Sequence, residues 1–274
     1  GLTKRVFLVE DYEDIIPMLF EAYDLANSGK PGPVFVEIPV NLQRFKGDVA
    51  ALPVYEPPVI ETVIDLDEIR KAVAILRSAR RPGIFAGWGA NGAKEELKIL
   101  AERLDAPVST TLQGLGTFPG DHPLHTGLAF GPSAVPASRN AFAGCDVMLA
   151  IGTRFSEIGT GFFFSAETPE NLIHVDIDPD VFNKNYPAKV ALAGDSKKIL
   201  EALLNTMGND SGASNRARTS GEMRINIATD KNNYRTIWQK HDSKGRVNPE
   251  SFFSDLRRSQ PKESIFVVDD GNHT

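Results

Sequence analysis

A glycine-rich stretch contains the first residues whose spacing indicates chemistry. Gly87, Gly89 and Gly92 have the spacing of a dinucleotide-binding loop and stand between an apparent strand and an apparent helix. Glycines there allow close backbone approaches, and the helix N-terminus offers unpaired N–H groups to a diphosphate. The acid that would bind a ribose is missing from the next strand end, where residues 109–111 read Ser-Thr-Thr. The stretch predicts either a phosphate-facing loop or a glycine turn without a ligand, and it argues against NAD.

A second candidate segment, residues 110–127, contains four glycines and two prolines directly after an expected strand. Loops at the carboxyl ends of parallel strands are where open α/β sheets bind ligands. Its histidines, His122 and His125, flank Pro123 and have no apparent third metal ligand. We therefore expect packed or solvated loop histidines there and no metal site.

Arg154 follows another expected strand. Its guanidinium could bind a phosphate or carboxylate through two parallel hydrogen bonds. It could equally pair with Glu157, three residues further along. The phenylalanines at 162–164 are expected to pack against a neighbouring domain.

Two alternating carboxylates end the segment 171–178. Asp176 and Asp178 would point to the same face of a strand, where they could accept ribose hydroxyls or bind a cation. Asp178 precedes Pro179 and could equally form a turn. Asp195 is expected to cap the helix that follows it.

The common catalytic patterns are missing from the sequence. It contains no GxSxG elbow, no HExxH pair, no P-loop lysine and no cysteine with an obvious base. These residues predict a domain that binds a ligand and does not transform it.

The elements that must position these residues lie between 65 and 206. Apolar strands alternate there with amphipathic helices, which indicates a parallel sheet covered on both faces. Asp65 is expected to cap the first helix. The expected strands are 82–86, 107–111, 146–152, 171–178 and 189–195, and the later helices are 93–104, 133–143 and 196–206.

Shorter segments flank this unit. A helix capped by Asp11 and a strand at 32–39 are too small to bury their own faces, so they are expected to belong to a domain that continues outside this chain. A polar, helical stretch is expected up to about residue 241. It is followed by a helix that begins at Asn248 and a strand at 264–274.

Composition describes an ordinary soluble protein of 274 residues with 41% hydrophobic and 24% charged side chains. Cys145 is the only cysteine, which favours a reducing cytosol. The net charge of -6 argues against nucleic acid or an anionic membrane as the main partner. We therefore expect a cytoplasmic protein.

Five strings resemble thiamine-diphosphate-dependent enzymes, most of all acetolactate synthase catalytic subunits. They occur in the family's order as SGKPGPVFVEIP, TTLQGLGTFPGDHPL, IGTRFSEIGTGFF, HVDIDPDVFNKN and VVDDGNHT. The resemblance implies an internal fragment with a Rossmann-like α/β central domain and partial segments of two neighbouring α/β domains. The implied order is 1–45 for the end of a pyrimidine-binding domain, 46–64 for a linker, 65–206 for the central domain, 207–244 for a linker and 245–274 for the start of a diphosphate-binding domain.

The resemblance also implies a central FAD site. The residues that would line it are Gly87, Gly89, Thr111, Leu112, Gly152, Arg154, Asp176, Ile177, Gly194 and Asp195. The sequence departs from the family twice. The segment LAFGPSA after Gly127 lacks a Met-His-Gly stretch, and Ile158 stands where a second arginine is usual. The resemblance therefore leaves FAD, ADP and an empty site open.

At the other end, Gly271, Asn272 and His273 match the loop that meets the phosphates of thiamine diphosphate. The catalytic glutamate and the magnesium-binding GDG motif find no match, so this chain alone is not expected to turn over. The parent is expected to be a homodimer or homotetramer with thiamine diphosphate and Mg²⁺ that decarboxylates a 2-keto acid and transfers the acyl unit. The alternatives are a stand-alone nucleotide-binding module and a purely structural domain.

Overall fold

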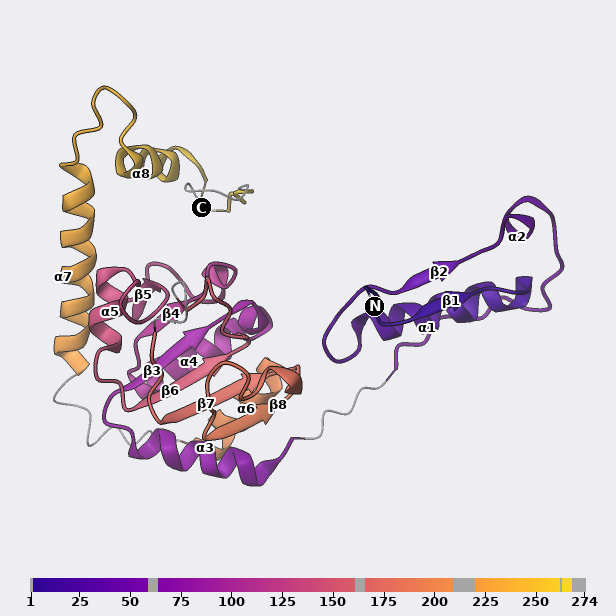
Figure 1. Cartoon of the computed structure of the whole chain (residues 1–274), viewed down its shortest axis with the longest axis horizontal. Coiled ribbons are helices and arrows are strands. Elements are labelled where there is room, and N and C mark those ends of the chain that lie inside the picture. The colour runs from indigo at the N-terminus through magenta and orange to yellow at the C-terminus, as the bar shows by residue number, and fades with distance from the viewer. Residues whose placement is uncertain (1, 59–63, 161–165, 209–219, 262, 268–274) are drawn as a thin grey trace.

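The computed structural model describes residues 2–58, 64–160, 166–208, 220–261 and 263–267. Figure 1 shows a small N-terminal unit, a central α/β domain and two C-terminal helices. The central domain contains the ten residues that the resemblance places at a FAD site.

Six parallel strands form the central sheet in the order β5-β4-β3-β6-β7-β8. The chain starts in the middle at β3, moves out to β5 and returns to β6 beside β3, so the strand order reverses between β3 and β6. The predicted α/β fold with a parallel sheet is confirmed. The strands are β3 Pro82–Ala86, β4 Val108–Thr110, β5 His125–Leu128, β6 Val147–Ile151, β7 Asn171–Asp176 and β8 Val190–Ala193.

Each face of the sheet has its own core because successive side chains of a strand point to opposite faces. Ile84 and Ala86 belong to the core formed with α3, α4 and α6, whereas Phe85 joins an aromatic core with Phe130 and Phe155. The helices of the first core are α3 Leu66–Ser78, α4 Lys94–Leu104 and α6 Ser196–Met207, and α5 Pro136–Phe142 adds Phe142 to the second. All five residues of β3 and of β6 are buried, as a sheet covered on both faces requires.

Three of the expected helix caps are present. Asp65 accepts hydrogen bonds from the backbone N–H groups of Asp67 and Glu68, and Asp195 accepts one from Lys198. Each such cap stabilises its helix by about 1 kcal/mol. Asn248 likewise accepts from Ser251 at the start of α8, Pro249–Ser259.

The N-terminal unit differs from expectation at its helix start. Asp11 does not cap α1, Ile15–Asn27, because a 3₁₀ turn at Tyr12–Asp14 intervenes and the Asp11 carboxylate accepts no capping hydrogen bond there. The strand expected at 32–39 shortens to β2, Phe35–Glu37, which pairs in parallel with β1, Val6–Leu8. These strands and the short helix α2, Val40–Arg44, are too brief to show a clear hydrophobic period.

Two further predictions need correction, one that missed a strand and one that expected a strand. The loop expected at 110–127 ends in β5, whose His125 begins an edge strand paired with β4. The strand expected at 264–274 is not formed at 264–267, where Val267 is 95% exposed. A strand needs a neighbouring strand for its backbone groups, and among the described residues none pairs with 264–267. Residues 268–274 lie outside the described part.

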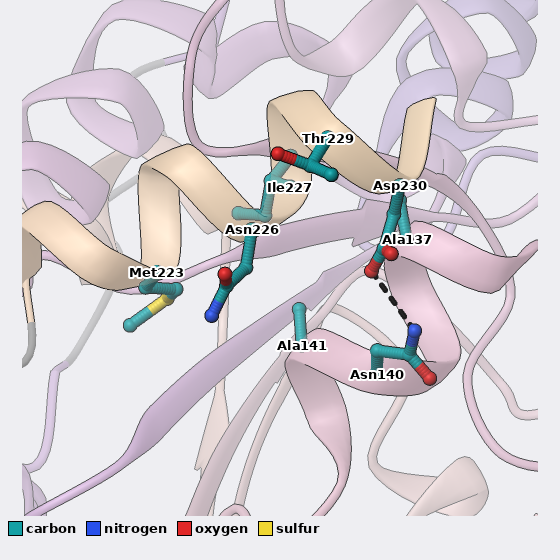
Figure 2. Close-up of a pocket in the computed structure, with 8 residues that line it drawn as sticks. All are labelled: Ala137, Asn140, Ala141, Met223, Asn226, Ile227, Thr229 and Asp230. Atoms are coloured by element: carbon teal, nitrogen blue, oxygen red, sulfur yellow. Dashed lines mark hydrogen bonds between the residues drawn. The ribbon is translucent and has the colours of Figure 1, made fainter. Parts of the chain in front are cut away.

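The helix α7, Ser220–Gln239, packs along α5 (Figure 2). Ala137 and Ala141 face Met223 and Ile227 across a cavity of about 240 Å³, and the Asn140 amide donates to Asp230 at 2.9 Å. No helix in the described ranges is both long and apolar enough to cross a membrane.

Candidate functional site

The ten candidate residues of the central domain share one edge of the sheet. They sit at or just beyond the carboxyl ends of five of the parallel strands, and such ends meet at a single edge. Open α/β sheets bind ligands at this edge, where the strand order reverses. The residues are Gly87 and Gly89 after β3, Thr111 and Leu112 after β4, Gly152 and Arg154 after β6, Asp176 and Ile177 at β7, and Gly194 and Asp195 after β8.

Gly87 and Gly89 pack directly on the backbone of Gly152. A Cβ atom would lie 2.3 Å from the Gly152 carbonyl oxygen if placed on Gly87, and 2.7 Å from the Gly152 Cα atom if placed on Gly89. The N–H of Gly89 donates to the same carbonyl oxygen at 3.0 Å. These two glycines are therefore required by contact between two loops. A Cβ atom on Gly92 would meet open space among the described residues, so packing does not require a glycine at this position.

The glycine-rich stretch continues as a 3₁₀ helix at Trp88–Ala93, and α4 begins only at Lys94. The Gly89 N–H is already paired with the Gly152 carbonyl oxygen, so this amide is not one of the unpaired N–H groups that a diphosphate could use. Trp88, between Gly87 and Gly89, is 66% exposed and lies at the rim of this sheet edge. Gly87 and Gly89 thus form a main-chain floor at this edge of the sheet.

Gly114 belongs to the same floor, although it is not among the residues predicted from the sequence. A Cβ atom on Gly114 would lie 2.6 Å from the Ala86 carbonyl oxygen, and its N–H donates to the Thr111 hydroxyl at 3.0 Å. Thr111 is buried, and its own N–H donates to Ala86 O at 3.0 Å. The position of Gly114, four residues after β4 in a glycine-rich loop, is the signal that could have identified it.

The loop after β6 presents Arg154 to solvent from a rigid backbone. Two carbonyl oxygens of this loop accept hydrogen bonds: the buried His174 has its Nε2 2.7 Å from Thr153 O, and the exposed Asn185 has its Nδ2 3.1 Å from Arg154 O. Phe155 has a φ of +51°, a conformation that costs a bulky residue of order 1–3 kcal/mol and persists only where packing enforces it. Because a carbonyl only accepts, His174 carries its hydrogen on Nε2.

The alternative pairing of Arg154 with Glu157 is not formed. Both side chains are exposed, and the Arg154 guanidinium contacts no carboxylate among the described residues. At the sheet edge it is thus a cation with up to five donors and no ionic partner in the part of the chain that the structure describes. The phenylalanines at 162–164 lie outside the described part.

The two carboxylates after β7 form consecutive turns. Asp176 Oδ1 accepts the Asp178 N–H at 2.9 Å, and Asp178 Oδ1 accepts the Asp180 N–H at 3.1 Å. Asp178 thereby caps the 3₁₀ helix Pro179–Val181, which confirms the turn-forming interpretation. No cluster of three or more metal-binding side chains occurs in the described part, and Asp176 Oδ2 has no partner there.

The end of β8 is used for helix capping. Asp195 accepts the Lys198 N–H at 3.1 Å, as the cap interpretation expected. Gly194 donates its N–H to the Asp176 carbonyl oxygen at 2.9 Å, which ties the ends of β7 and β8 together.

The loop histidines are packed, as predicted. His122 Nε2 lies 3.1 Å from a Glu102 carboxylate oxygen, and His125 Nδ1 lies 3.2 Å from the Gly120 carbonyl oxygen. Burial, helped by the Lys231 ammonium, lowers the pKa of His125 to about 4. Burial likewise lowers the pKa of His174. Both rings are therefore neutral near pH 7.

The predicted diphosphate-contacting residues Gly271, Asn272 and His273 lie outside the described residues. The sheet edge of the central domain is thus the candidate site that can be built from the structure. It combines a main-chain floor with the Arg154 guanidinium and Asp176 Oδ2, neither of which has a partner within the described ranges.

Comparison with known proteins gives a consistent answer. Residues 69–203 match the family described as thiamine pyrophosphate enzyme, central domain. The acetolactate synthase large subunit of Corynebacterium glutamicum is 36% identical over 75% of this chain and 33% of its own length. That of Buchnera aphidicola is 29% identical over 99% of this chain and 48% of its own length.

A solved structure supports the fold. An X-ray structure of a Mycobacterium smegmatis protein assigned as a thiamin diphosphate-dependent enzyme superposes with a TM-score of 0.59 at 24% identity, over 76% of this chain and 40% of that one. The chain spans 33% and 48% of the length of the two curated relatives named above. Residues 69–203 of this chain therefore belong to the family of thiamine pyrophosphate enzyme central domains.

Proposed function

We propose that this chain is the central portion of an acetolactate synthase-type enzyme. Such an enzyme would decarboxylate a 2-keto acid and transfer the acyl unit to an acceptor. The observation that carries this proposal is the match to acetolactate synthase large subunits, which in one case extends over 99% of the chain. Thiamine diphosphate would supply the carbanion chemistry when bound in the parent.

The flanking segments fit the corresponding domain order. We propose that 1–45 is the end of a pyrimidine-binding domain and that 245–274 begins a diphosphate-binding domain, with 46–64 and 207–244 as linkers around 65–206. Leu8 and Phe35, on the paired strands β1 and β2, are 48% and 51% exposed. A sheet of two three-residue strands cannot bury such side chains by itself, so a larger domain is needed to cover them.

Residues Gly271, Asn272 and His273 would meet the phosphates of thiamine diphosphate in the parent. An amide and an imidazole N–H are suitable donors to phosphate oxygens. The sequence offers no match to the family's catalytic glutamate or to its Mg²⁺-binding motif, so the chain alone should be inactive.

Assays of acetolactate formation test the assigned activity and the inactivity of the chain alone separately. The parent protein should form acetolactate from pyruvate when thiamine diphosphate and Mg²⁺ are supplied, and residues 1–274 alone should form none. Acetolactate is measured after acid conversion to acetoin, with the heat-denatured parent as control. Turnover by the chain alone would contradict the inactive-fragment proposal, and an inactive, folded parent that binds thiamine diphosphate would contradict the assigned activity.

The central sheet edge is proposed to bind a nucleotide diphosphate, either FAD or ADP. The residues present fit that group because, among the described residues, the Arg154 guanidinium has no carboxylate partner and could bind phosphate oxygens, and Asp176 Oδ2 has no partner and could accept a ribose hydroxyl. The floor of the site carries no side chains where Gly87, Gly89 and Gly152 meet. In this proposal the nucleotide is bound at the sheet edge and has no redox role.

Calorimetric titration of the chain with ADP and with FAD tests the nucleotide site. Saturable binding that weakens in Arg154→Met and Asp176→Asn is expected, whereas Asp180→Asn, with its exposed carboxylate, should bind as the unaltered chain does. A flavin absorbance band in the purified parent would select FAD over ADP. If neither nucleotide binds, the site proposal is wrong.

A homodimer or homotetramer in the cytosol completes the proposed parent. Its small-molecule substrate would be a 2-keto acid, and neither nucleic acid nor membrane is expected as a partner. Sedimentation velocity of the parent should give a mass of two or four subunits, and a monomer would contradict the oligomer proposal.

A further inference from the structure

A single lysine joins the N-terminal unit to the candidate site. Lys30, in the connection between α1 and β2, donates from Nζ to Asp178 Oδ2 at 2.7 Å across 148 residues of sequence. The Asp178 side chain is only 16% exposed, whereas the Lys30 side chain is 61% exposed. Figure 1 shows the N-terminal unit on the side of the central domain where β8 lies.

The connection that carries Lys30 is itself held in place. Lys4 Nζ donates to the carbonyl oxygens of Ser28 at 2.6 Å and of Lys30 at 3.2 Å. The N–H of Gly32 donates back to the Ala26 carbonyl oxygen at 2.9 Å, which closes the loop after α1. The Lys30 ammonium is therefore presented from a cross-linked loop and not from a free tail.

The contact is continuous with the candidate site through hydrogen bonds. Lys30 binds one oxygen of Asp178, and the other oxygen holds the Asp180 N–H. The N–H of Asp178 in turn donates to Asp176 Oδ1, and Oδ2 of Asp176 has no partner among the described residues. Lys30 thus neutralises the middle one of three carboxylates within five residues, a role that Lys184 of the central domain supports from further away.

We propose that Lys30 is a positioning residue through which the N-terminal unit docks on the turn after β7 and holds Asp176 ready for its ligand. The inference rests on the proposed nucleotide site. Its consequence is coupling: if docking favours nucleotide binding, nucleotide binding must favour docking by the same factor. The two units would then respond to one ligand together.

Docking is tested without any nucleotide by zero-length carbodiimide cross-linking of the whole chain, read by peptide mass spectrometry. An amide between Lys30 and Asp178 is expected. The pair Lys197 and Glu96, 3.7 Å apart within the central domain, serves as the positive control. If the control pair forms a cross-link and the pair of Lys30 and Asp178 forms none, the docking proposal is overturned.

Positioning is tested by the ADP affinity of Lys30→Met, Lys30→Arg and Lys46→Met. Lys46 is exposed and has no ion pair among the described residues, so it is the matched control. An exposed ion pair of this kind changes an equilibrium by about 1.5- to 5-fold, so Lys30→Met should weaken ADP binding by that factor at low salt. Lys30→Arg should restore the affinity, Lys46→Met should leave it unchanged, and 1 M salt should remove the difference. Equal affinities at low salt would overturn the proposal.

Hydrogen exchange distinguishes this inference from the nucleotide site. The amides of Asp178 and Asp180 should exchange about 1.5- to 5-fold faster in Lys30→Met than in Lys46→Met, with no ligand present. Failure of the unaltered chain to bind ADP, together with a faster exchange, would remove the nucleotide site and leave Lys30 as the anchor of the turn. Equal exchange would reject the positioning role whether or not ADP binds.

Discussion

The backbones of Gly89 and Gly152 touch where the strand order of the sheet reverses. A Cβ atom on Gly152 would lie 2.4 Å from the Gly89 Cα atom, and Gly152 has a φ of +57°. Two loops that end β3 and β6 are thereby fastened without any side chain between them. The floor of the candidate site is main chain, which is why both loops need glycine there.

Replacing Gly152 by alanine should destabilise the central domain strongly. The substitution combines a left-handed backbone with a backbone clash, for which we expect a loss of about 2–4 kcal/mol in the free energy of unfolding. Gly92→Ala is the matched control, because a Cβ atom on Gly92 meets open space among the described residues. Urea unfolding followed by circular dichroism measures both. Similar stability of the two variants would contradict the packing role of Gly152.

Stability should fall as the pH falls from about 6.5 to about 4. The folded-state pKa of His125 is lowered to about 4, mainly by burial, while the unfolded chain titrates near about 6.5. The unfolded state therefore binds more protons in this window, and the stabilisation present above pH 6.5 is lost, by at most about 3 kcal/mol. His174 acts in the same direction.

Urea midpoints at several pH values test the histidine effect. His125→Leu should show a shallower loss between pH 6.5 and pH 4 than the unaltered chain. His241→Gln, at an exposed histidine, should keep the original dependence. An unchanged dependence in His125→Leu would assign the acid sensitivity to other groups.

Asp195 should act as a helix cap more than as a ligand contact. Asp195→Ala removes the acceptor for the Lys198 N–H and should cost about 1 kcal/mol of stability. Asp195→Asn keeps a good capping side chain and should retain both stability and ADP affinity. Thermal unfolding and calorimetry measure the two effects. A large loss of ADP affinity in Asp195→Asn would show that the carboxylate charge meets the nucleotide.

Arg224 should hold α7 on the central domain. Its Nε and Nη2 atoms lie 3.0 and 2.6 Å from Asp105 Oδ1, and the Asp105 side chain is 16% exposed. Arg224→Met should open α7 about 1.5- to 5-fold more often. Hydrogen exchange of residues 221–239 measures this, with exposed Lys240→Met as control. Unchanged exchange would place the attachment of α7 in its packing on α5.

The central domain was largely predictable because its signals are local. Strand β3 begins at Pro82 and ends at Ala86, as its short apolar run predicted, and α3 begins after the Asp65 cap. Strand β5 was missed because His125–Leu128 is short and contains Gly127. Its strand character depends on pairing with β4. The strand expected after residue 263 failed at 264–267 for the converse reason, since apolar residues alone do not provide a partner.

The candidate site shows the same division. The positions of Arg154, Asp176 and Asp195 at strand ends follow from the alternation of strands and helices, so local sequence was sufficient to locate them. The sequence left the role of each residue open. Contacts in the folded protein decide some of these roles. Glu157 turned out not to pair with Arg154, and Lys198 supplied the N–H that makes Asp195 a cap.

Sequence by itself determined the family, the parallel α/β domain and the order of the elements, because apolar periodicity, caps and motif strings are properties of neighbouring residues. Tertiary structure alone decided that Gly87 and Gly89 pack on Gly152 and that Lys30 reaches Asp178. The physical reason is distance along the chain: such contacts join segments separated by tens to hundreds of residues, whose approach depends on the completed sheet and not on local preference.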